Sequence, residues 1–243
     1  MTSILATDEP VALAVTAAIR TGDLARLRSV LAEHPWLATA RIGPRTLLHV
    51  AADWPGHLPH GAQTVSTLVA AGADVNARFV GSHTETPLHW AASCDDVAVL
   101  DALLDAGADI EAPGAVLGGG SPLADARGFK QWRAASRLVE RGALTTLMDA
   151  ATLGLTDRVT ELLAGLPATG PDAEEVSLAL WGACHGGRPA CAELLVGHGA
   201  DLDVVPPWEH LTPLDAAERE GADELAGWLR DRGARRFAEL RRG

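Results

Sequence analysis

Two aspartates are the side chains of this sequence best placed for acid–base chemistry. Asp125 and Asp149 each lie two residues after a leucine, Leu123 and Leu147, that begins a similar short segment. Neighbouring helices pack about 8–10 Å apart, so equivalent positions would bring the two carboxyl groups to one surface. Such a pair in an apolar setting raises one pKa and can supply a general acid. With His185 expected nearby, these residues form the candidate catalytic set; the alternative is that each aspartate caps a loop or pairs with a basic residue.

The histidine and cysteine side chains give weaker evidence of a chemical site than the two aspartates. Cys184 precedes His185, but adjacent helical residues point about 100° apart, and Cys184 falls at a core position, where a thiol is inert. His57 and His60 have a spacing that could bind zinc, but no cysteine or carboxylate set completes a tetrahedral site. We therefore expect no metal and no cofactor.

The sequence contains internal repeats, and the elements that the repeats form determine where these residues lie. The segments Leu48–Ala52 (LHVAA) and Leu88–Ala92 (LHWAA) are nearly identical. Weaker copies begin at four further leucines: Leu123, Leu147, Leu180 and Leu214. In four copies a Gly-Ala pair follows the anchor leucine after 19 residues, an offset that chance would rarely repeat.

The repeated unit predicts a pair of helices. Leu88, Ala91 and Ala92 have the i, i+3, i+4 spacing of one helical stripe. A second helix is expected over Val97–Ala106, followed by Gly107 as a left-handed cap. The small alanines allow the two helices to pack closely.

Several motifs resemble the ankyrin repeat: Thr86–His89 (TPLH), Gly107–Ile110 (GADI), Gly72–Ala77 (GADVNA), Gly199–Leu202 (GADL) and Thr212–Leu214 (TPL). The resemblance implies an all-α solenoid of stacked helix pairs with short hairpin loops. It also implies that His49 and His89 are structural and bond to the backbone of neighbouring hairpins.

We expect one domain over residues 1–243, with degenerate repeats at both ends. The approximate repeats are 10–42, 43–79, 80–115, 116–144, 145–172, 173–205 and 206–243. The second repeat carries five extra residues, assigned to Trp54–Gln63 between its helices. The hairpin between the fourth and fifth repeats is missing, and the fifth repeat ends irregularly over Leu162–Pro171.

The resemblance further implies that the first helices and the hairpin tips line a concave groove. Helical spacing then selects the candidate binding residues, several of them aromatic. They are Asp53, Trp54, His83, Glu85, Trp90, Cys94, Phe129, His185, Trp208, Glu209 and His210. A second interpretation is that Trp54 and Trp90 only cover the inserted loop.

Composition limits the partners. Against 20 basic residues stand 32 acidic ones, a net charge of −12, which argues against nucleic acid and anionic membranes. No apolar run approaches the length of a membrane span. The first ten residues lack the features of a secretory signal, and the three cysteines are too few for a disulfide scaffold, so we expect a cytoplasmic protein. The near absence of lysine suggests a bacterial source.

The leading functional hypothesis is a protein-binding module that uses the aromatic-rich concave groove. No complete catalytic motif is present, so the balance is against an enzyme. The alternative is a small-molecule or unusual enzyme site in the groove. There Asp125 and Asp149 would act as acid and base, and Trp54 and Trp90 would form the walls.

Overall fold

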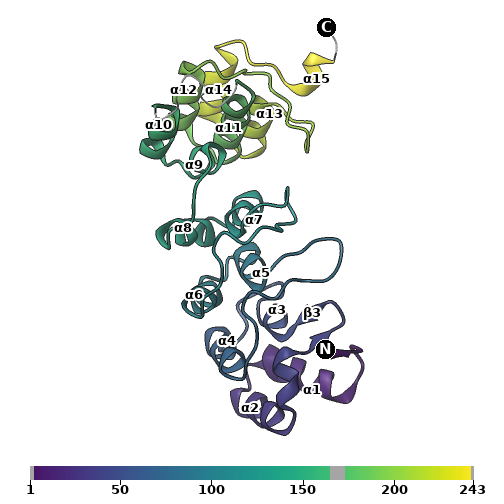
Figure 1. The fold of residues 1–243 in the computed structure, drawn as a ribbon. Helices are drawn as coiled ribbons and strands as arrows, with labels where there is room; N and C mark the ends of the chain where they lie inside the picture. The colour runs from purple at the N-terminus through teal and green to yellow at the C-terminus, as the bar shows by residue number, and fades with distance from the viewer. Residues whose placement is uncertain (1–2, 165–172, 242–243) are drawn as a thin grey trace. The chain divides into compact units, whose positions relative to one another are not determined.

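The computed structural model describes residues 3–164 and 173–241, and these residues are mostly α-helical (Figure 1). The expected all-α solenoid class is confirmed. The chain divides into two compact units, Met1–Ala143 and Leu144–Gly243, which we call unit 1 and unit 2 and describe separately.

Unit 1 is built from helices that follow one another in pairs. They are α1 (Pro10–Thr21), α2 (Leu24–Glu33), α3 (Leu47–Ala51), α4 (Gly61–Ala70), α5 (Pro87–Ser93), α6 (Val97–Asp105), α7 (Pro122–Gly128) and α8 (Trp132–Glu140), with a short 3₁₀ helix, η1 (Pro35–Thr39). The anchor leucines Leu48, Leu88 and Leu123 are fully buried, as the repeat predicts.

Three two-residue strands accompany the first two helix pairs of unit 1. β1 (Ile4–Leu5) runs parallel to β2 (Arg41–Ile42), and β2 is antiparallel to β3 (Arg45–Thr46). The sheet therefore ties the start of the described chain to the hairpin that precedes α3.

The motif histidines fix the starts of the first helices, as the resemblance implies. Thr86 Oγ1 lies 2.9 Å from His89 Nδ1, and His89 Nε2 lies 3.3 Å from the carbonyl oxygen of Gly120 in the next hairpin. His49 Nε2 lies 3.1 Å from the carbonyl oxygen of Glu85. Burial lowers the pKa of both histidines, that of His49 to about 4, so both act as neutral connectors between successive repeats.

The inserted segment of the second repeat packs against its neighbours. The Cβ that an alanine would add at Gly56 would lie 2.7 Å from Cys94 Cβ, so the loop backbone approaches α5 closely. The backbone N–H of His57 donates to Asp96 Oδ2 at 2.6 Å. The expected loop Trp54–Gln63 is too long, because α4 already begins at Gly61.

Unit 2 contains three further helix pairs and a short terminal helix. They are α9 (Leu147–Leu153), α10 (Thr156–Ala164), α11 (Ala173–His185), α12 (Pro189–Gly197), α13 (Pro213–Arg219), α14 (Asp223–Arg230) and α15 (Phe237–Leu240). Most of the irregular ending expected at Leu162–Pro171 lies outside the described residues.

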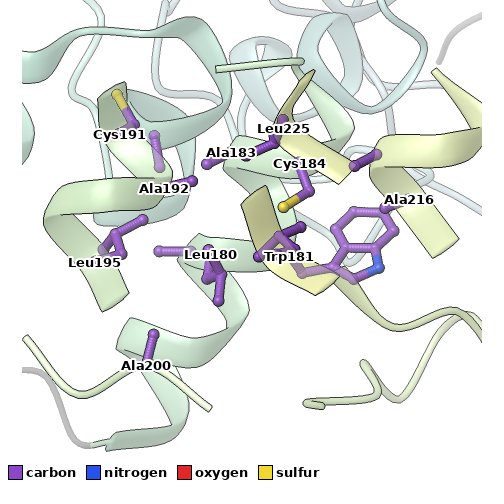
Figure 2. Close-up of a cluster of buried hydrophobic side chains, with 14 of the residues drawn as sticks. Leu180, Trp181, Ala183, Cys184, Cys191, Ala192, Leu195, Ala200, Ala216 and Leu225 are labelled. Atoms are coloured by element: carbon purple, nitrogen blue, oxygen red, sulfur yellow. The ribbon is translucent and has the colours of Figure 1, made fainter. Parts of the chain in front are cut away.

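The core of unit 2 is centred on α11 (Figure 2). Leu180 packs there with Leu195 of α12 and Leu225 of α14, and all three are almost fully buried. Cys184 is also fully buried, and this burial raises the pKa of its thiol. The prediction that Cys184 is an inert core residue is therefore confirmed.

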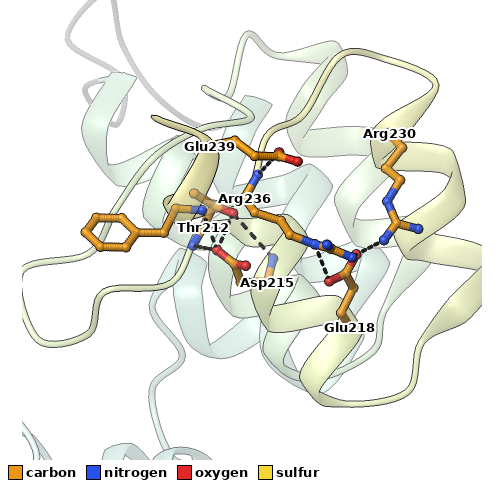
Figure 3. A network of polar contacts seen from close by, with 7 residues as sticks. Thr212, Asp215, Glu218, Arg230, Arg236 and Glu239 are labelled. Atoms are coloured by element: carbon orange, nitrogen blue, oxygen red, sulfur yellow. Dashed lines mark hydrogen bonds and ion pairs between the residues drawn. The ribbon is translucent and has the colours of Figure 1, made fainter. Parts of the chain in front are cut away.

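A polar network attaches α15 to α13 (Figure 3). Asp215 Oδ2 accepts from the N–H of Thr212 at 3.0 Å and from the N–H of Phe237 at 2.8 Å. Arg236 Nε donates to Glu218 Oε2 at 2.8 Å, and Arg230 pairs with the other oxygen of Glu218. Among the described residues, no helix is long and apolar enough to cross a membrane.

Candidate functional site

The site in unit 1 is built around Asp125 in α7. This side chain is fully buried, and its Oδ1 accepts a hydrogen bond from the N–H of Leu117 at 3.3 Å. Among the described residues, no backbone N–H or hydroxyl group donates to Oδ2. The carboxyl of Glu85 stands beside it, and a hydrogen bond between the two side chains requires a proton on one of them. Burial, and then this contact with Glu85, raises the pKa of Asp125 well above its usual range.

Glu85 precedes α5 at the end of a hairpin and is itself buried. The indole Nε1 of Trp90 donates to Glu85 Oε2 at 3.0 Å, and His83 Nδ1 lies 2.7 Å from the same oxygen. Two ring nitrogens therefore lie close to one oxygen of Glu85, and of these Trp90 Nε1 forms a hydrogen bond. The carboxyl of Asp125, in the next repeat, lies beside the same side chain.

An aromatic cluster surrounds this pair of acids. The Trp90 ring lies 5.0 Å from His49 and 5.6 Å from Phe79, measured between centroids. Phe79 stacks on His83 at 4.3 Å. Trp90 is half-buried and supports its neighbours, so truncating it would disturb more than an exposed surface.

The expected equivalence of Asp125 and Asp149 is wrong. Asp149 is the third residue of α9, where its Oδ2 accepts from the hydroxyl of Thr146 at 2.6 Å and from the N–H of Thr146 at 3.0 Å. Asp125 is the fourth residue of α7 and points to a hairpin instead. The two aspartates belong to different units, and the carboxyl that Asp125 meets is that of Glu85. For Asp149 the capping alternative is correct.

Two adjacent hairpins give the acid pair an apolar border. The guanidinium of Arg78 bonds to the carbonyl oxygens of Thr84 and Pro113, which links the hairpins. Val116 and Leu117, next to the N–H that binds Asp125, are both more than 40% exposed, at 49% and 42%. Further exposed apolar side chains of unit 1 include Val80, Phe129 and Trp54.

Other predicted binding residues of unit 1 lie near the inserted loop. Trp54 is 78% exposed, whereas Asp53 Oδ2 is paired with Arg20 and Arg45 at 2.9 Å each. Cys94 is half-buried under Gly56, and burial raises the pKa of its thiol to about 11. Asp53 and Cys94 therefore have structural partners, and Trp54 remains available.

In unit 2, three of the four remaining predicted residues lie around Trp181: His185, Trp208 and Glu209. The prediction of an exposed His185 is wrong, because its ring is buried and stacks on Trp181 at 5.2 Å. Trp208 meets Trp181 edge to face at 5.9 Å and is 55% exposed. Arg219 bridges the group, with its guanidinium 3.1 Å from His185 Nδ1 and paired with Glu209. His210 lies apart from this group and stacks on Phe237 at 5.2 Å.

The pairing of Glu85 with Asp125 is the feature that sequence reasoning missed. A signal was present, since Asp125 follows Trp90 by 35 residues, the same step that separates the anchors Leu88 and Leu123. A residue one repeat after Trp90 faces the hairpin that Trp90 also contacts. Glu85 was assigned to a hairpin tip, without this partner.

A metal site and a ligand pocket place different demands on the described residues. Among them, no group of three or more His, Cys, Asp or Glu side chains could hold a metal ion. Two open grooves of about 660 and 610 Å³ lie between α2 and α4 and between α4 and α6. Neither groove is lined by the candidate residues, so the acid pair belongs to no cavity described here.

Comparison with known proteins identifies ankyrin repeats in part of the chain. Residues 15–113 match the model for ankyrin repeats, in three copies. The crystal structure of the human ASB11 ankyrin repeat domain resembles the chain with a TM-score of 0.55 and 21% sequence identity, over 91% of this chain and 97% of that one. No curated protein matches. Residues 15–113 therefore carry ankyrin repeats, and the solved domain shares its fold with most of the chain. These repeats support a role as a protein-interaction module.

Proposed function

We propose that the protein binds a protein partner through aromatic surfaces on the concave side that the ankyrin fold implies. In unit 1 the surface comprises Trp54, His83, Glu85, Trp90 and Phe129, with Asp53 and Cys94 at its edge. In unit 2 it comprises Trp208, Glu209 and His210, supported from below by His185.

One observation carries this proposal: large aromatic side chains are exposed in the segments that directly precede or follow the first helices of three pairs, α3, α7 and α13. Trp54 is 78% exposed, Trp208 55% and Phe129 43%. Exposed apolar surface is unfavourable unless something covers it, and tryptophan is among the residues most enriched in binding hot spots. The net charge of −12 favours a partner with basic groups.

Native mass spectrometry of the protein purified from its own host tests the proposal. We expect a co-bound protein on the wild type and its loss from the double variant Trp54→Ala, Trp208→Ala. Trp36→Ala is the matched control, because Trp36 is a 43% exposed tryptophan in η1, outside both surfaces. A partner that stays bound to the double variant would contradict the proposal.

The small-molecule or enzyme alternative rests on Asp125 alone, since Asp149 caps α9. A buried carboxyl with a raised pKa is a property of general acids, and this is the observation that favours the alternative. The same mass spectrum separates the two proposals, because a small molecule would add a small, fixed mass in place of a protein.

A further inference from the structure

Building on the proposed function, we infer that four arginines of unit 1 bind an acidic segment of the protein partner. They are Arg20 of α1, Arg41 and Arg45 of the hairpin before α3, and Arg78 of the hairpin before α5, and we call them the arginine row. The segment that fits them carries two or more carboxylates beside an apolar residue.

Two arginines of the row converge on one carboxylate oxygen. Arg20 Nη2 and Arg45 Nη1 each lie 2.9 Å from Asp53 Oδ2. One negative charge therefore faces two positive charges, and the group keeps an excess of positive charge. Both cations are accessible from solvent, with 51% of the Arg20 side chain and 28% of the Arg45 side chain exposed. A carboxylate of the partner can therefore reach them.

The other two arginines are bonded to carbonyl groups of the backbone. Arg41 donates from Nη1 to the oxygen of Pro44 at 2.9 Å and from Nη2 to the oxygen of Arg78 at 2.7 Å. The guanidinium of Arg78 donates to the oxygens of Thr84 and Pro113. Among the described residues, every hydrogen bond of these two guanidiniums goes to a carbonyl oxygen, so no carboxylate there neutralises either charge.

These carbonyl bonds leave both guanidiniums able to bind a carboxylate. Arg41 and Arg78 are half-buried, and each guanidinium has five N–H donors in one plane, more than its carbonyl partners use. The bonds also hold the two groups in place before a partner arrives, which reduces the entropy lost on binding. A planar guanidinium matches a carboxylate in a bidentate contact.

Exposed apolar side chains stand next to Arg41. The N–H of Val80 donates at 3.2 Å to the Pro44 carbonyl oxygen that Arg41 also bonds, and the Val80 side chain is 61% exposed. Ile4, 70% exposed, is the partner of Arg41 in the β1–β2 pairing. Burial of this surface favours a partner residue that is apolar and adjacent to the acidic ones.

The arginine row is locally basic although the whole chain is acidic. Residues 34–52 contain two of its arginines and no aspartate or glutamate, and residues 75–84 contain a third and again no acid. The acids that follow these segments are Asp53, which two arginines share, and Glu85, which is buried. Exposed charges interact over about 8 Å at physiological ionic strength, so a segment on the row meets this local charge. The net charge of −12 acts on other parts of the partner.

The probe is a library of random 12-residue peptides displayed on phage and selected on the full chain. We expect enriched peptides to carry at least two aspartates or glutamates beside an apolar residue. The best peptide is synthesised, and its affinity is measured by calorimetry. Replacing its acidic residues by their amides should weaken binding about tenfold, because each partly exposed ion pair contributes a few-fold at most. Raising the ionic strength from about 0.05 to about 0.5 M should also weaken it.

Variants of the protein test both halves of the row. Arg20→Gln with Arg45→Gln, and Arg41→Gln with Arg78→Gln, should each weaken the peptide about fivefold or more. Arg28→Gln is the matched control and should change nothing, because Arg28 is an exposed arginine of α2 outside the row. Circular dichroism checks that all variants keep their helical content.

Asp53→Asn gives a result of opposite sign that misfolding cannot imitate. Without this carboxylate, Arg20 and Arg45 lose their shared acidic partner, so the acidic peptide should bind about twofold more tightly or better. Unchanged or weaker binding to Asp53→Asn would show that the peptide does not use these two arginines.

The inference is overturned by enrichment of peptides without acidic residues, or by a selection that enriches none. It is also overturned if both double variants bind the acidic peptide as tightly as the wild type, or if a single-stranded oligonucleotide displaces the peptide. The proposed function has its own measurement, the loss of the native partner from the Trp54→Ala, Trp208→Ala variant. A native partner that leaves that variant but stays on both arginine variants would uphold the proposed function and reject the arginine row.

Discussion

Three acidic side chains near the starts of first helices show how position alone decides their chemistry. Asp149 and Asp215 are third residues of their helices, and each accepts from the N–H and hydroxyl of the capping threonine. In α7 the third position is Ala124, so Asp125, one residue later, has no capping group to bond. It turns to the next hairpin and meets Glu85. A shift of one residue thus converts a helix cap into a buried acid pair.

This pair should give the stability of the protein a distinct dependence on pH. The pKa of Asp125 is raised to about 8 in the folded chain, against about 3.9 when unfolded. Its contribution to stability is therefore fully present below pH 3.9 and is lost as the pH rises through the folded pKa, because the unfolded state releases the proton first. We expect Asp125→Asn to remove part of the fall in the free energy of unfolding over this window, measured by urea titration.

The comparison must be a difference between variants, since Asp125 is not the only group in the protein that contributes to the pH dependence of stability. Trp36→Ala is the control, because it replaces an exposed side chain that carries no ionisable group and should leave the pH dependence unchanged. Parallel stability curves for the wild type and Asp125→Asn would contradict the assignment of a shared proton.

The repeat predicts the helix pairs, but it does not predict the length of every first helix and its caps. The step from the capping residue to the left-handed residue after the first helix is nine residues for Thr86–Asp95 and Thr212–Gly221. It is eight for Thr146–Gly154, so the fifth repeat is one residue short. The anchor pattern could not show this, because leucine and methionine at positions 147 and 148 both suit an apolar stripe. The contact between the inserted loop and Cys94 was also beyond prediction, since it depends on tertiary packing.

The inserted loop provides an element-scale prediction. Gly56→Ala should destabilise the protein by about 2–4 kcal/mol, because the left-handed backbone (φ +75) disfavours alanine and the new methyl would collide with Cys94. The matched control is Gly43→Ala, at φ +57 with nothing within 4 Å, which should cost only about 1 kcal/mol. Urea unfolding measures both.

The reactivity of the Cys94 thiol shows whether the loss of stability in Gly56→Ala comes from displacement of the inserted loop. If the loop is displaced from α5 in Gly56→Ala, the thiol of Cys94 should react faster with a bulky disulfide reagent than in Gly43→Ala. Equal stabilities and equal thiol reactivities in the two variants would show that the inserted loop does not pack on Cys94.

For the chain as a whole, the sequence predicts those features that depend on short-range contacts repeated from one helix pair to the next. The buried anchor leucines and the helix pairs follow from short-range spacing, because each repeat packs mainly on its neighbours. The structural role of His49 and His89 follows from the resemblance to the ankyrin repeat. The acid pair joins residues 40 positions apart, and the buried position of His185 depends on Trp181 and Arg219. One domain over 1–243 remains a prediction from the repeats.

Whether the chain folds as one domain can be tested on unit 2 alone. Residues 144–243 expressed alone should fold, because the cluster from Leu147 to Ala234 lies entirely within this unit and three helix pairs are enough for a stack. We expect helical circular dichroism and a cooperative urea transition. Leu180→Ala, at the centre of the cluster, should cost about 2–5 kcal/mol in the fragment. In the full chain Leu180→Ala should cost about the same, whereas Leu100→Ala in α6 can destabilise only unit 1. A fragment without a cooperative transition would show that unit 2 needs residues before Leu144 to fold, and the single-domain prediction would then be favoured.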